Sequence, residues 1–189
     1  MAWQHTPATG LWTRDKSQPA PEAGIFIYPA GMTPAIQTLK RAHVSFELLS
    51  YHHDPANNHA FGLEAATQLG QDPHEIFKTL IASSERGELM VGMVPVSAQL
   101  DLKALAHAYG CRHCEMASPA TAERATGYVV GGISPLGQKK KLPMFIDTSA
   151  QTLLWVRVSA GRRGLQVSLS PQDLARLVEA RFVAIARDS

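Results

Sequence analysis

The chain has 189 residues, of which 45% are hydrophobic and 18% charged, and its formal net charge at neutral pH is +2. This composition is sufficient for one packed domain of ordinary size and excludes a highly charged, disordered chain. The nearly balanced charge means that affinity for nucleic acid has to come from local clusters of lysine and arginine. The sequence contains no run of 18 apolar residues, so no membrane span is predicted.

The cysteines and the first residues bear on the compartment. Cys111 and Cys114 are the only cysteines, which excludes a disulfide framework and favours a reducing cytoplasm. The first thirty residues lack a basic start followed by an apolar block, so we expect no secretory signal.

Residues 1–31 differ from the rest of the chain. Proline and glycine interrupt them throughout, and no hydrophobic periodicity continues beyond the short apolar patch at residues 24–28. We interpret residues 1–31 as a flexible N-terminal extension whose apolar patch docks on the domain. Met32 is the predicted start of that domain, which covers residues 32–189.

Helices are predicted mainly from their terminal residues. Thr33 and Ser118 each precede a proline, which is the pattern of an N-cap followed by the first helical position. Ser170 begins a segment that resembles a capping box, and glycines after two other apolar segments suit helix ends. The first predicted helix begins at residue 34, and the others cover residues 60–69, 101–109, 118–126 and 170–179.

Strands are predicted where apolar residues alternate or form short runs between turn residues. They cover residues 45–51, 76–83, 89–96, 144–147, 153–158, 165–169 and 182–186. Strands outnumber helices, and several follow one another across short turns. We therefore predict an α/β (α+β) single domain with a mixed, largely antiparallel, barrel-like sheet and flanking helices.

A glycine-rich loop over residues 128–143 is the first candidate for function. Gly131 and Gly132 allow the backbone to approach a bound molecule, and residues 134–137 (SPLG) predict a turn. Residues 139–141 are three consecutive lysines. A loop of this kind is suited to binding a phosphate or a developing oxyanion. The alternative interpretation is a tight hairpin with a solvated run of charge.

A second candidate is Lys78, which interrupts an apolar run over residues 76–81. Lysine is seldom fully buried without a partner. Lys78 is therefore either an anion anchor in a cleft or a strand lysine on the solvated face, and alternation alone favours the second. A second basic, glycine-rich turn over residues 158–164 contains Arg162 and Arg163, and it also fits an ordinary hairpin loop.

Two groups of potential metal ligands are better explained as structural. Cys111 and Cys114 form a CxxC with His107 nearby, but a structural zinc site normally needs four ligands and no second CxxC exists. His52, His53 and Asp54 are adjacent on an extended chain, where neighbouring side chains point to opposite sides. We interpret residues 52–59 as a polar loop and predict no metal.

Several segments taken together resemble one known family. They are residues 32–35 (MTPA), 51–55 (YHHDP), 77–80 (FKTL), 99–103 (QLDLK), 115–117 (EMA), 126–129 (TGYV), 131–143 (GGISPLGQKKKLP) and 161–165 (GRRGL). From about Met32 to Arg187 the chain resembles the YbaK-type Cys-tRNA(Pro) deacylases of the YbaK/EbsC family. These enzymes are relatives of the editing domain of bacterial prolyl-tRNA synthetases. Residues 131–140 (GGISPLGQKK) are the most specific part of the match.

The resemblance implies a set of site residues. Lys78 is expected to be the essential lysine, and Gly131 and Gly132 are expected to line the aminoacyl pocket as catalytic residues. The expected substrate-binding residues are Tyr51, Phe61, Thr79, Ser134, Pro135, Leu136, Gly137 and Ser159. Some family members have an acidic residue where this chain has Gln166, so a role that depends on a carboxylate there is not carried over.

The resemblance also implies the reaction and the partners. The expected activity is trans-editing hydrolysis of mischarged Cys-tRNA(Pro), with Cys-tRNA(Cys) as a second substrate, in which the substrate's own thiol attacks the ester. No cofactor is required for this chemistry. The expected partners are the 3′ end of aminoacylated tRNA and prolyl-tRNA synthetase in a ternary complex. Two alternatives stay open: a deacylase of another mischarged tRNA such as Ala-tRNA(Pro), and a non-catalytic module that binds aminoacyl-tRNA or the synthetase.

Overall fold

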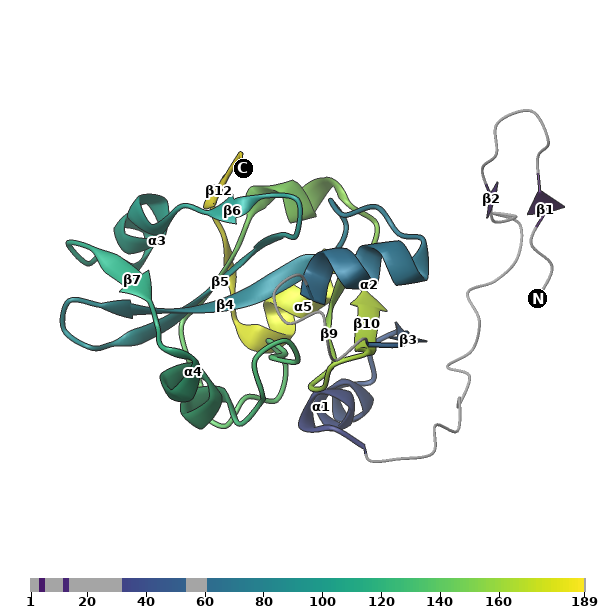
Figure 1. Cartoon of the computed structure of the whole chain (residues 1–189), viewed down its shortest axis with the longest axis horizontal. Helices are drawn as coiled ribbons and strands as arrows, with labels where there is room; N and C mark the ends of the chain where they lie inside the picture. Colours follow the sequence, from purple (N-terminus) through teal and green to yellow (C-terminus); the bar gives the residue numbers. More distant parts are fainter. Residues whose placement is uncertain (1–3, 6–11, 14–31, 54–60, 189) are drawn as a thin grey trace.

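Two sheets form the centre of the domain in the computed structural model, which describes residues 4–5, 12–13, 32–53 and 61–188 (Figure 1). The larger sheet has the order β11-β8-β5-β4-β7, and the smaller has the order β3-β10-β9. The larger sheet contains β4 (Phe77–Ser84), β5 (Leu89–Pro95), β7 (Cys114–Met116), β8 (Met144–Ile146) and β11 (Arg181–Phe182). The smaller contains β3 (Phe46–Ser50), β9 (Val156–Ser159) and β10 (Leu165–Leu169). Two further pairs are β6 (Gln99–Leu100) with β12 (Ala186–Arg187), and β1 (Gln4–His5) with β2 (Trp12–Thr13).

Most strand pairs are antiparallel, and only β5–β8 and β8–β11 are parallel among the pairs of the two main sheets. This confirms the predicted mixed, largely antiparallel architecture. The two sheets are joined where Ile76, directly before β4, forms a parallel bridge with Arg157 of β9. The two main sheets are therefore linked at this bridge, and the described strands do not close into a barrel.

The first helix begins at the predicted residue, and the other four begin and end within one residue of the predicted bounds. They are α1 (Pro34–Ala42), α2 (Phe61–Leu69), α3 (Leu102–Tyr109), α4 (Pro119–Thr126) and α5 (Pro171–Val178), with a short 3-10 helix at Thr148–Thr152. The side chains of Thr33, Ser118 and Ser170 accept hydrogen bonds from the first turns of α1, α4 and α5. A cap of this kind stabilises a helix by about 1 kcal/mol. Of the described helices, none has both the length and the apolar character that a bilayer span requires.

The C-terminal segment differs from the prediction. In place of one strand over residues 182–186, the chain forms two short strands, β11 and β12, that pair with different sheets. The buried carboxylate of Asp147 accepts hydrogen bonds from the backbone N–H of Ile185 (2.9 Å) and Ala186 (2.8 Å). Because these donors are drawn to a side chain after β8, the segment cannot continue along the sheet edge. The predicted strand over residues 153–158 likewise begins only at Val156, after the 3-10 helix.

This carboxylate is expected to be a major stabilising contact. Burial alone would raise the pKa of Asp147, but hydrogen bonds from Ser149, Ile185 and Ala186 outweigh burial and lower it. Asp147→Ala leaves the backbone N–H groups of Ser149, Ile185 and Ala186 without this acceptor, so the free energy of unfolding at pH 7 should fall by about 1–3 kcal/mol.

The pH dependence has a definite sign. Since the pKa of Asp147 is lower in the folded protein, its contribution is complete above the unfolded-state pKa of about 3.9. The contribution is lost as the pH falls through the lower folded-state pKa. The free energies of unfolding of the wild type and of Asp147→Ala, measured by urea denaturation, should therefore converge in acid. A matched control is Asp101→Ala, which removes only the N-cap of α3. A loss for Asp147→Ala no larger than for that control would contradict the assignment.

The predicted N-terminal extension, residues 1–31, lies outside the described residues except for β1 and β2. The part of the predicted polar loop from Asp54 to His59 also lies outside them.

Candidate active site

The glycine-rich loop over residues 128–143 forms no β-strand and is held by its own hydrogen bonds. The Tyr128 hydroxyl donates to the carbonyl oxygens of Leu136 (2.8 Å) and Gly137 (3.3 Å). Burial raises the pKa of Tyr128 to about 12, so the hydroxyl remains a donor. Ser134 accepts from the backbone N–H of Leu136 (3.2 Å), as expected for the predicted turn. The loop is therefore an ordered structure, and the alternative of a tight hairpin does not describe it.

Several loop residues predicted to bind substrate point into the protein. Ser134 and Leu136 are fully buried, Pro135 is also buried, and Leu136 packs in the main core. Gly137 has a left-handed backbone, and a side chain there would meet the backbone of Pro34 at 2.6 Å. These four residues shape the loop, and any contact of theirs with a substrate would have to come from the backbone.

The two basic, glycine-rich turns lie against each other. A Cβ atom on Gly132 would lie 2.8 Å from the Cα and carbonyl carbon of Arg162, so only glycine fits there. The Arg163 Nε donates to the carbonyl oxygen of Val130 at 3.0 Å. Segments about thirty residues apart in sequence are thus in direct contact.

Phe61, the first residue of α2, connects these turns to the rest of the site. Gly131 has a φ of +86°, and a Cβ there would lie 2.9 Å from three carbons of the Phe61 ring. The Arg163 guanidinium lies 4.9 Å from the centroid of the same ring, within cation–π range. The His53 ring centroid lies 5.4 Å from it. The structure therefore brings together Gly131 and Phe61, as predicted, and adds Arg163 and His53.

Lys78 lies on the side of β4 that carries the site. Ile76 packs with Ala65 and Ala66 of α2, and Lys78 is two residues further along the same side of the strand. Residues that form a bridge project to the same side of the sheet, so Arg157 lies on the side of Ile76. Ser159, two residues after Arg157, projects to that side as well, and so does Gln166, which pairs with Ser159. Lys78, Ser159 and Gln166 therefore project from one side of the junction between the two sheets.

The charge of Lys78 is not compensated within the described part of the chain. Its side chain is half-buried, burial lowers its pKa, and no described residue forms an ion pair or hydrogen bond with it. A half-buried ammonium without a partner is destabilising. Such a group at the edge of a site is typical of an anion-binding residue, which favours the functional interpretation over the solvated-strand alternative.

Tyr51 and Thr79 have different surroundings. Tyr51 packs against the apolar cluster under α2, and its backbone N–H donates to the carbonyl oxygen of Gly164 at 3.0 Å. Tyr51 therefore borders the second basic turn, as a pocket wall would. Thr79 follows Lys78 directly, so alternation turns it to the opposite face of β4, the face that packs in the main core through Phe77 and Ile81. The structure does not bring Thr79 to the side of Lys78.

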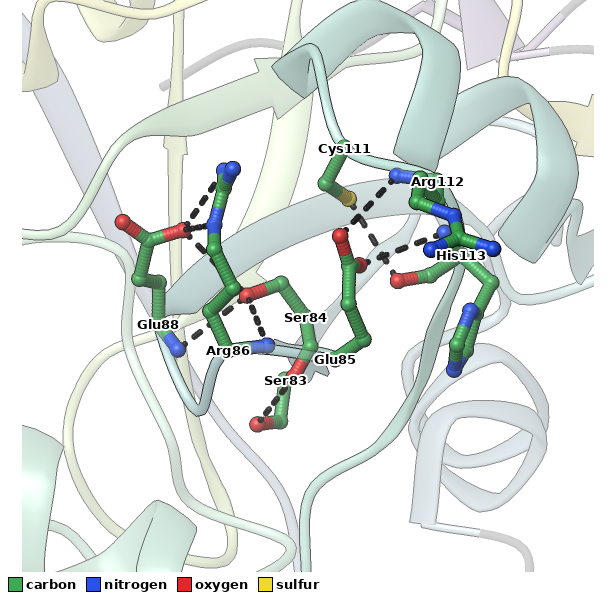
Figure 2. A network of polar contacts seen from close by, with 8 residues as sticks. All are labelled: Ser83, Ser84, Glu85, Arg86, Glu88, Cys111, Arg112 and His113. Carbon is green, nitrogen blue, oxygen red and sulfur yellow. Dashed lines mark hydrogen bonds and ion pairs between the residues drawn. The ribbon is translucent and has the colours of Figure 1, made fainter.

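The CxxC segment lies at the other end of β4 and is held by a polar network (Figure 2). The Glu85 carboxylate accepts from the backbone N–H groups of Arg112 and His113, both at 3.3 Å. Cys114 donates to the carbonyl oxygen of Leu102, and burial raises the pKa of both cysteine thiols, which disfavours the thiolate that metals and redox chemistry need. Six residues of strand separate Lys78 from Ser84, about 20 Å. Nowhere in residues 32–53 and 61–188 do three His, Cys, Asp or Glu side chains gather as a metal site requires.

Replacing both cysteines is therefore expected to leave catalysis unchanged. Cys111→Ser/Cys114→Ser should retain full activity if the fold survives, and chelator treatment of the wild type should have no effect. The measurement is the rate of aminoacyl-ester hydrolysis before and after chelation. Loss on chelation with recovery on adding zinc would overturn this interpretation.

Sequence reasoning missed one contact in this region. His53 Nδ1 lies 2.8 Å from Oε2 of Glu64, and both side chains are almost completely buried. Glu64 is the only charged residue of α2. A single carboxylate in an otherwise apolar helical segment was the available signal, and its partner could be identified only from the fold.

Comparisons with known proteins identify a family for this chain. Residues 59–177 match the model of a family described as the aminoacyl-tRNA editing domain. The chain is 36% identical over 130 residues to a protein of Enterococcus faecalis named "Putative Cys-tRNA(Pro)/Cys-tRNA(Cys) deacylase EbsC", a match that covers 69% of this chain and 79% of the relative. It is also 30% identical over 109 residues to the proline–tRNA ligase of Moorella thermoacetica, covering 57% of this chain but only 19% of the ligase.

Solved structures show the same fold. The hypothetical protein APE2540 superimposes with a TM-score of 0.73 at 22% identity, covering 82% of this chain and 99% of that one. A structure described as "a putative trans-editing enzyme for prolyl tRNA synthetase" superimposes with a TM-score of 0.67 at 24% identity, covering 81% and 92%. From the match over residues 59–177 and the identity to EbsC, the chain belongs to the aminoacyl-tRNA editing domain family, in its YbaK/EbsC branch.

Proposed function

We propose that the protein is an aminoacyl-tRNA deacylase that edits in trans, hydrolysing Cys-tRNA(Pro) and, as a second substrate, Cys-tRNA(Cys). The observation that carries the proposal is the half-buried Lys78, which has no ionic partner among the described residues and lies on the side of β4 that faces α2. Phe61 at the start of that helix contacts Gly131, so the lysine and the glycine loop border the same helix. Membership of the editing family supports hydrolysis of an aminoacyl ester, and the identity to EbsC supports cysteine as the amino acid.

The source of the thiol supports a substrate-assisted mechanism. The two cysteines of the chain lie at the far end of β4, so any thiol at the site has to come from the substrate. The substrate thiol attacks its own ester carbonyl and forms a cyclic thioester, which releases the tRNA. A group held in an attacking geometry gains the large effective molarity of an intramolecular reaction. Lys78 binds the phosphate or ribose of the terminal nucleotide and fixes that geometry.

The donor for the developing oxyanion is assigned to Gly131. The Gly132 N–H donates to the carbonyl oxygen of Val129 at 2.9 Å, so this donor is already used within the loop. The Gly131 N–H has no acceptor among the described residues. Gly132 contributes through its missing side chain, which lets the backbone of Arg162 approach.

Partners follow from the substrate. Cysteine and proline differ little in size, and a synthetase pocket discriminates such differences by only about 1–3 kcal/mol. A separate hydrolytic site removes the resulting error. A net charge of +2 favours weak intrinsic binding of tRNA, so we propose a ternary complex with prolyl-tRNA synthetase in the cytoplasm.

The proposal is tested by hydrolysis of three substrates with binding measured in parallel. Cys-tRNA(Pro) and Cys-tRNA(Cys) should be deacylated much faster than Ala-tRNA(Pro). Faster cleavage of Ala-tRNA(Pro) would assign a different editing specificity. Binding of all three without hydrolysis would show a non-catalytic module.

A further inference from the structure

Glu64 is a buried carboxylate whose position calls for an explanation. It lies on α2 with its side chain 4% exposed, and it is the only charged residue of that helix. A charge in such a position is strongly destabilising unless it is paired. Its partner is His53, which follows β3 and whose Nδ1 lies 2.8 Å from Oε2 of Glu64.

The hydrogen bond determines what the other ring nitrogen presents. An ionised carboxylate only accepts, so Nδ1 of His53 donates its proton to Glu64. In the neutral ring, Nε2 then carries a free lone pair. This Nε2 is buried and has no hydrogen-bonding partner among the described residues. Buried polar atoms are nearly always hydrogen-bonded in folded proteins. An unpaired acceptor inside a site therefore indicates that a ligand supplies its hydrogen-bonding partner.

The dyad lies within the candidate site. The His53 ring is 5.4 Å from the ring of Phe61, and the same Phe61 ring contacts Gly131 and Arg163. Among the described residues, the charged and titratable groups around His53 include Glu64 on α2, Arg163 over the shared Phe61 ring, and Tyr51, which directly follows β3. The pKa of Tyr51 is raised, first by burial and further by the charge of Glu64. The imidazole is therefore hydrogen-bonded to α2 and lies beside Phe61, whose ring also borders Gly131 and Arg163.

A surface pair in the same chain shows the contrast. His74 and Asp72 have the same Nδ1-to-carboxylate distance of 2.8 Å, but their side chains are 74% and 59% exposed. That pair lies in a turn at the surface, where water completes the hydrogen bonding of both groups. Between these two pairs, the His53–Glu64 pair alone combines burial, an Nε2 without a partner among the described residues, and a ring contact with Phe61.

We propose that His53 accepts the proton of the substrate thiol during deacylation and that Glu64 positions it for this transfer. This inference rests on the proposed function. The thiol proton moves to Nε2 as the sulfur–carbon bond forms at the ester carbonyl. When the carbon–oxygen bond breaks, the same proton passes from Nε2 to the leaving 3′-oxygen of the ribose. Atoms and charge balance, and no oxidant, metal or further reactant is consumed.

The test is the pH dependence of single-turnover deacylation of Cys-tRNA(Pro). At pH 7, His53→Asn should lower the rate by about 100-fold or more, as expected for loss of a general base. The substrate thiol has a pKa of about 8.5, so it ionises without help as the pH rises to 9. The ratio of wild-type to variant rates should therefore shrink by roughly tenfold between pH 7 and pH 9. Glu64→Gln, which keeps the shape but alters the partner of Nδ1, should show a smaller loss with the same trend.

Controls separate chemistry from folding and from binding. His52→Asn changes the adjacent, exposed histidine, and His74→Asn breaks the surface pair; both should retain full activity. Each variant is also tested for binding of a non-hydrolysable amide analogue of Cys-tRNA(Pro), which should be unchanged for His53→Asn. A loss of rate for His53→Asn that is the same at every pH, or that appears as weaker analogue binding, would show a structural role and overturn the inference. Full activity of His53→Asn would overturn it while leaving the proposed function intact. No deacylation by the wild type would overturn both.

Discussion

Lys78→Ala is expected to abolish deacylation while leaving the protein folded. The lysine is the only functional candidate whose charge is half-buried without a partner in the described residues, and burial lowers its pKa. A charge-assisted contact with a phosphate or ribose is strong because it forms in a partly desolvated site. Its loss should reduce the rate by at least about 100-fold, comparable to removal of one electrostatic contact in an active site.

Replacing Lys78 is also expected not to destabilise the protein. Since the folded-state pKa of Lys78 is lowered, the charged form is less favourable in the folded than in the unfolded protein at neutral pH. Replacing it should leave the melting temperature unchanged or raise it, and Lys78→Met, which keeps the apolar stem, should do so most clearly. Lys103→Met on the exposed face of α3 is the matched control for activity. A folded Lys78→Ala protein with near-normal turnover would remove this residue from the site.

Gly131→Ala is expected to have the second large effect, through loss of space as well as of backbone freedom. The new methyl group would lie 2.9 Å from the Phe61 ring, which is closer than real Cβ contacts allow. The ring or the loop must therefore move, and with it the N–H group assigned to the oxyanion. Loss of one such donor typically costs about 2.7–4 kcal/mol of transition-state stabilisation, or a rate loss of about 100- to 1,000-fold.

Two other glycines separate these causes. Gly87 and Gly110 also have left-handed backbones, with φ of +77° and +92°, but a Cβ at either position would meet nothing within 4 Å. Gly87→Ala and Gly110→Ala should therefore lower stability through backbone strain and leave the rate of deacylation unchanged. Equal losses of activity in all three variants would show that strain alone explains the Gly131 result.

Local sequence signals predicted the helices well because capping is a short-range effect. Thr33, Ser118 and Ser170 are followed within three residues by the donors that they accept from, so sequence alone located these ends. The junction between the two main sheets is formed by one bridge between Ile76 and Arg157, which no local pattern encodes.

The site was predicted only in part, because some of its features have local sequence signals and others depend on contacts between distant segments. Lys78 and the glycine loop were identified by a charge in an apolar strand and by family-specific residues. The packing of Gly132 against Arg162, and the pair of His53 with Glu64, depend on how distant or uncharacteristic segments meet. The prediction of one C-terminal strand was wrong because the backbone N–H of Ile185 donates to the carboxylate of Asp147, 38 residues earlier in the chain.

The proposed mechanism requires the thiol of the substrate as the attacking group. The decisive measurement compares single-turnover deacylation of Cys-tRNA(Pro) and Ser-tRNA(Pro), which differ by one atom, with rapid-quench analysis of the released amino acid. A hydroxyl is far less ionised than a thiol near neutral pH, so the serine ester should react more than about 100-fold more slowly. Cyclised cysteine should appear transiently before free cysteine. Equal rates for the two esters, with free cysteine as the first product, would contradict the mechanism.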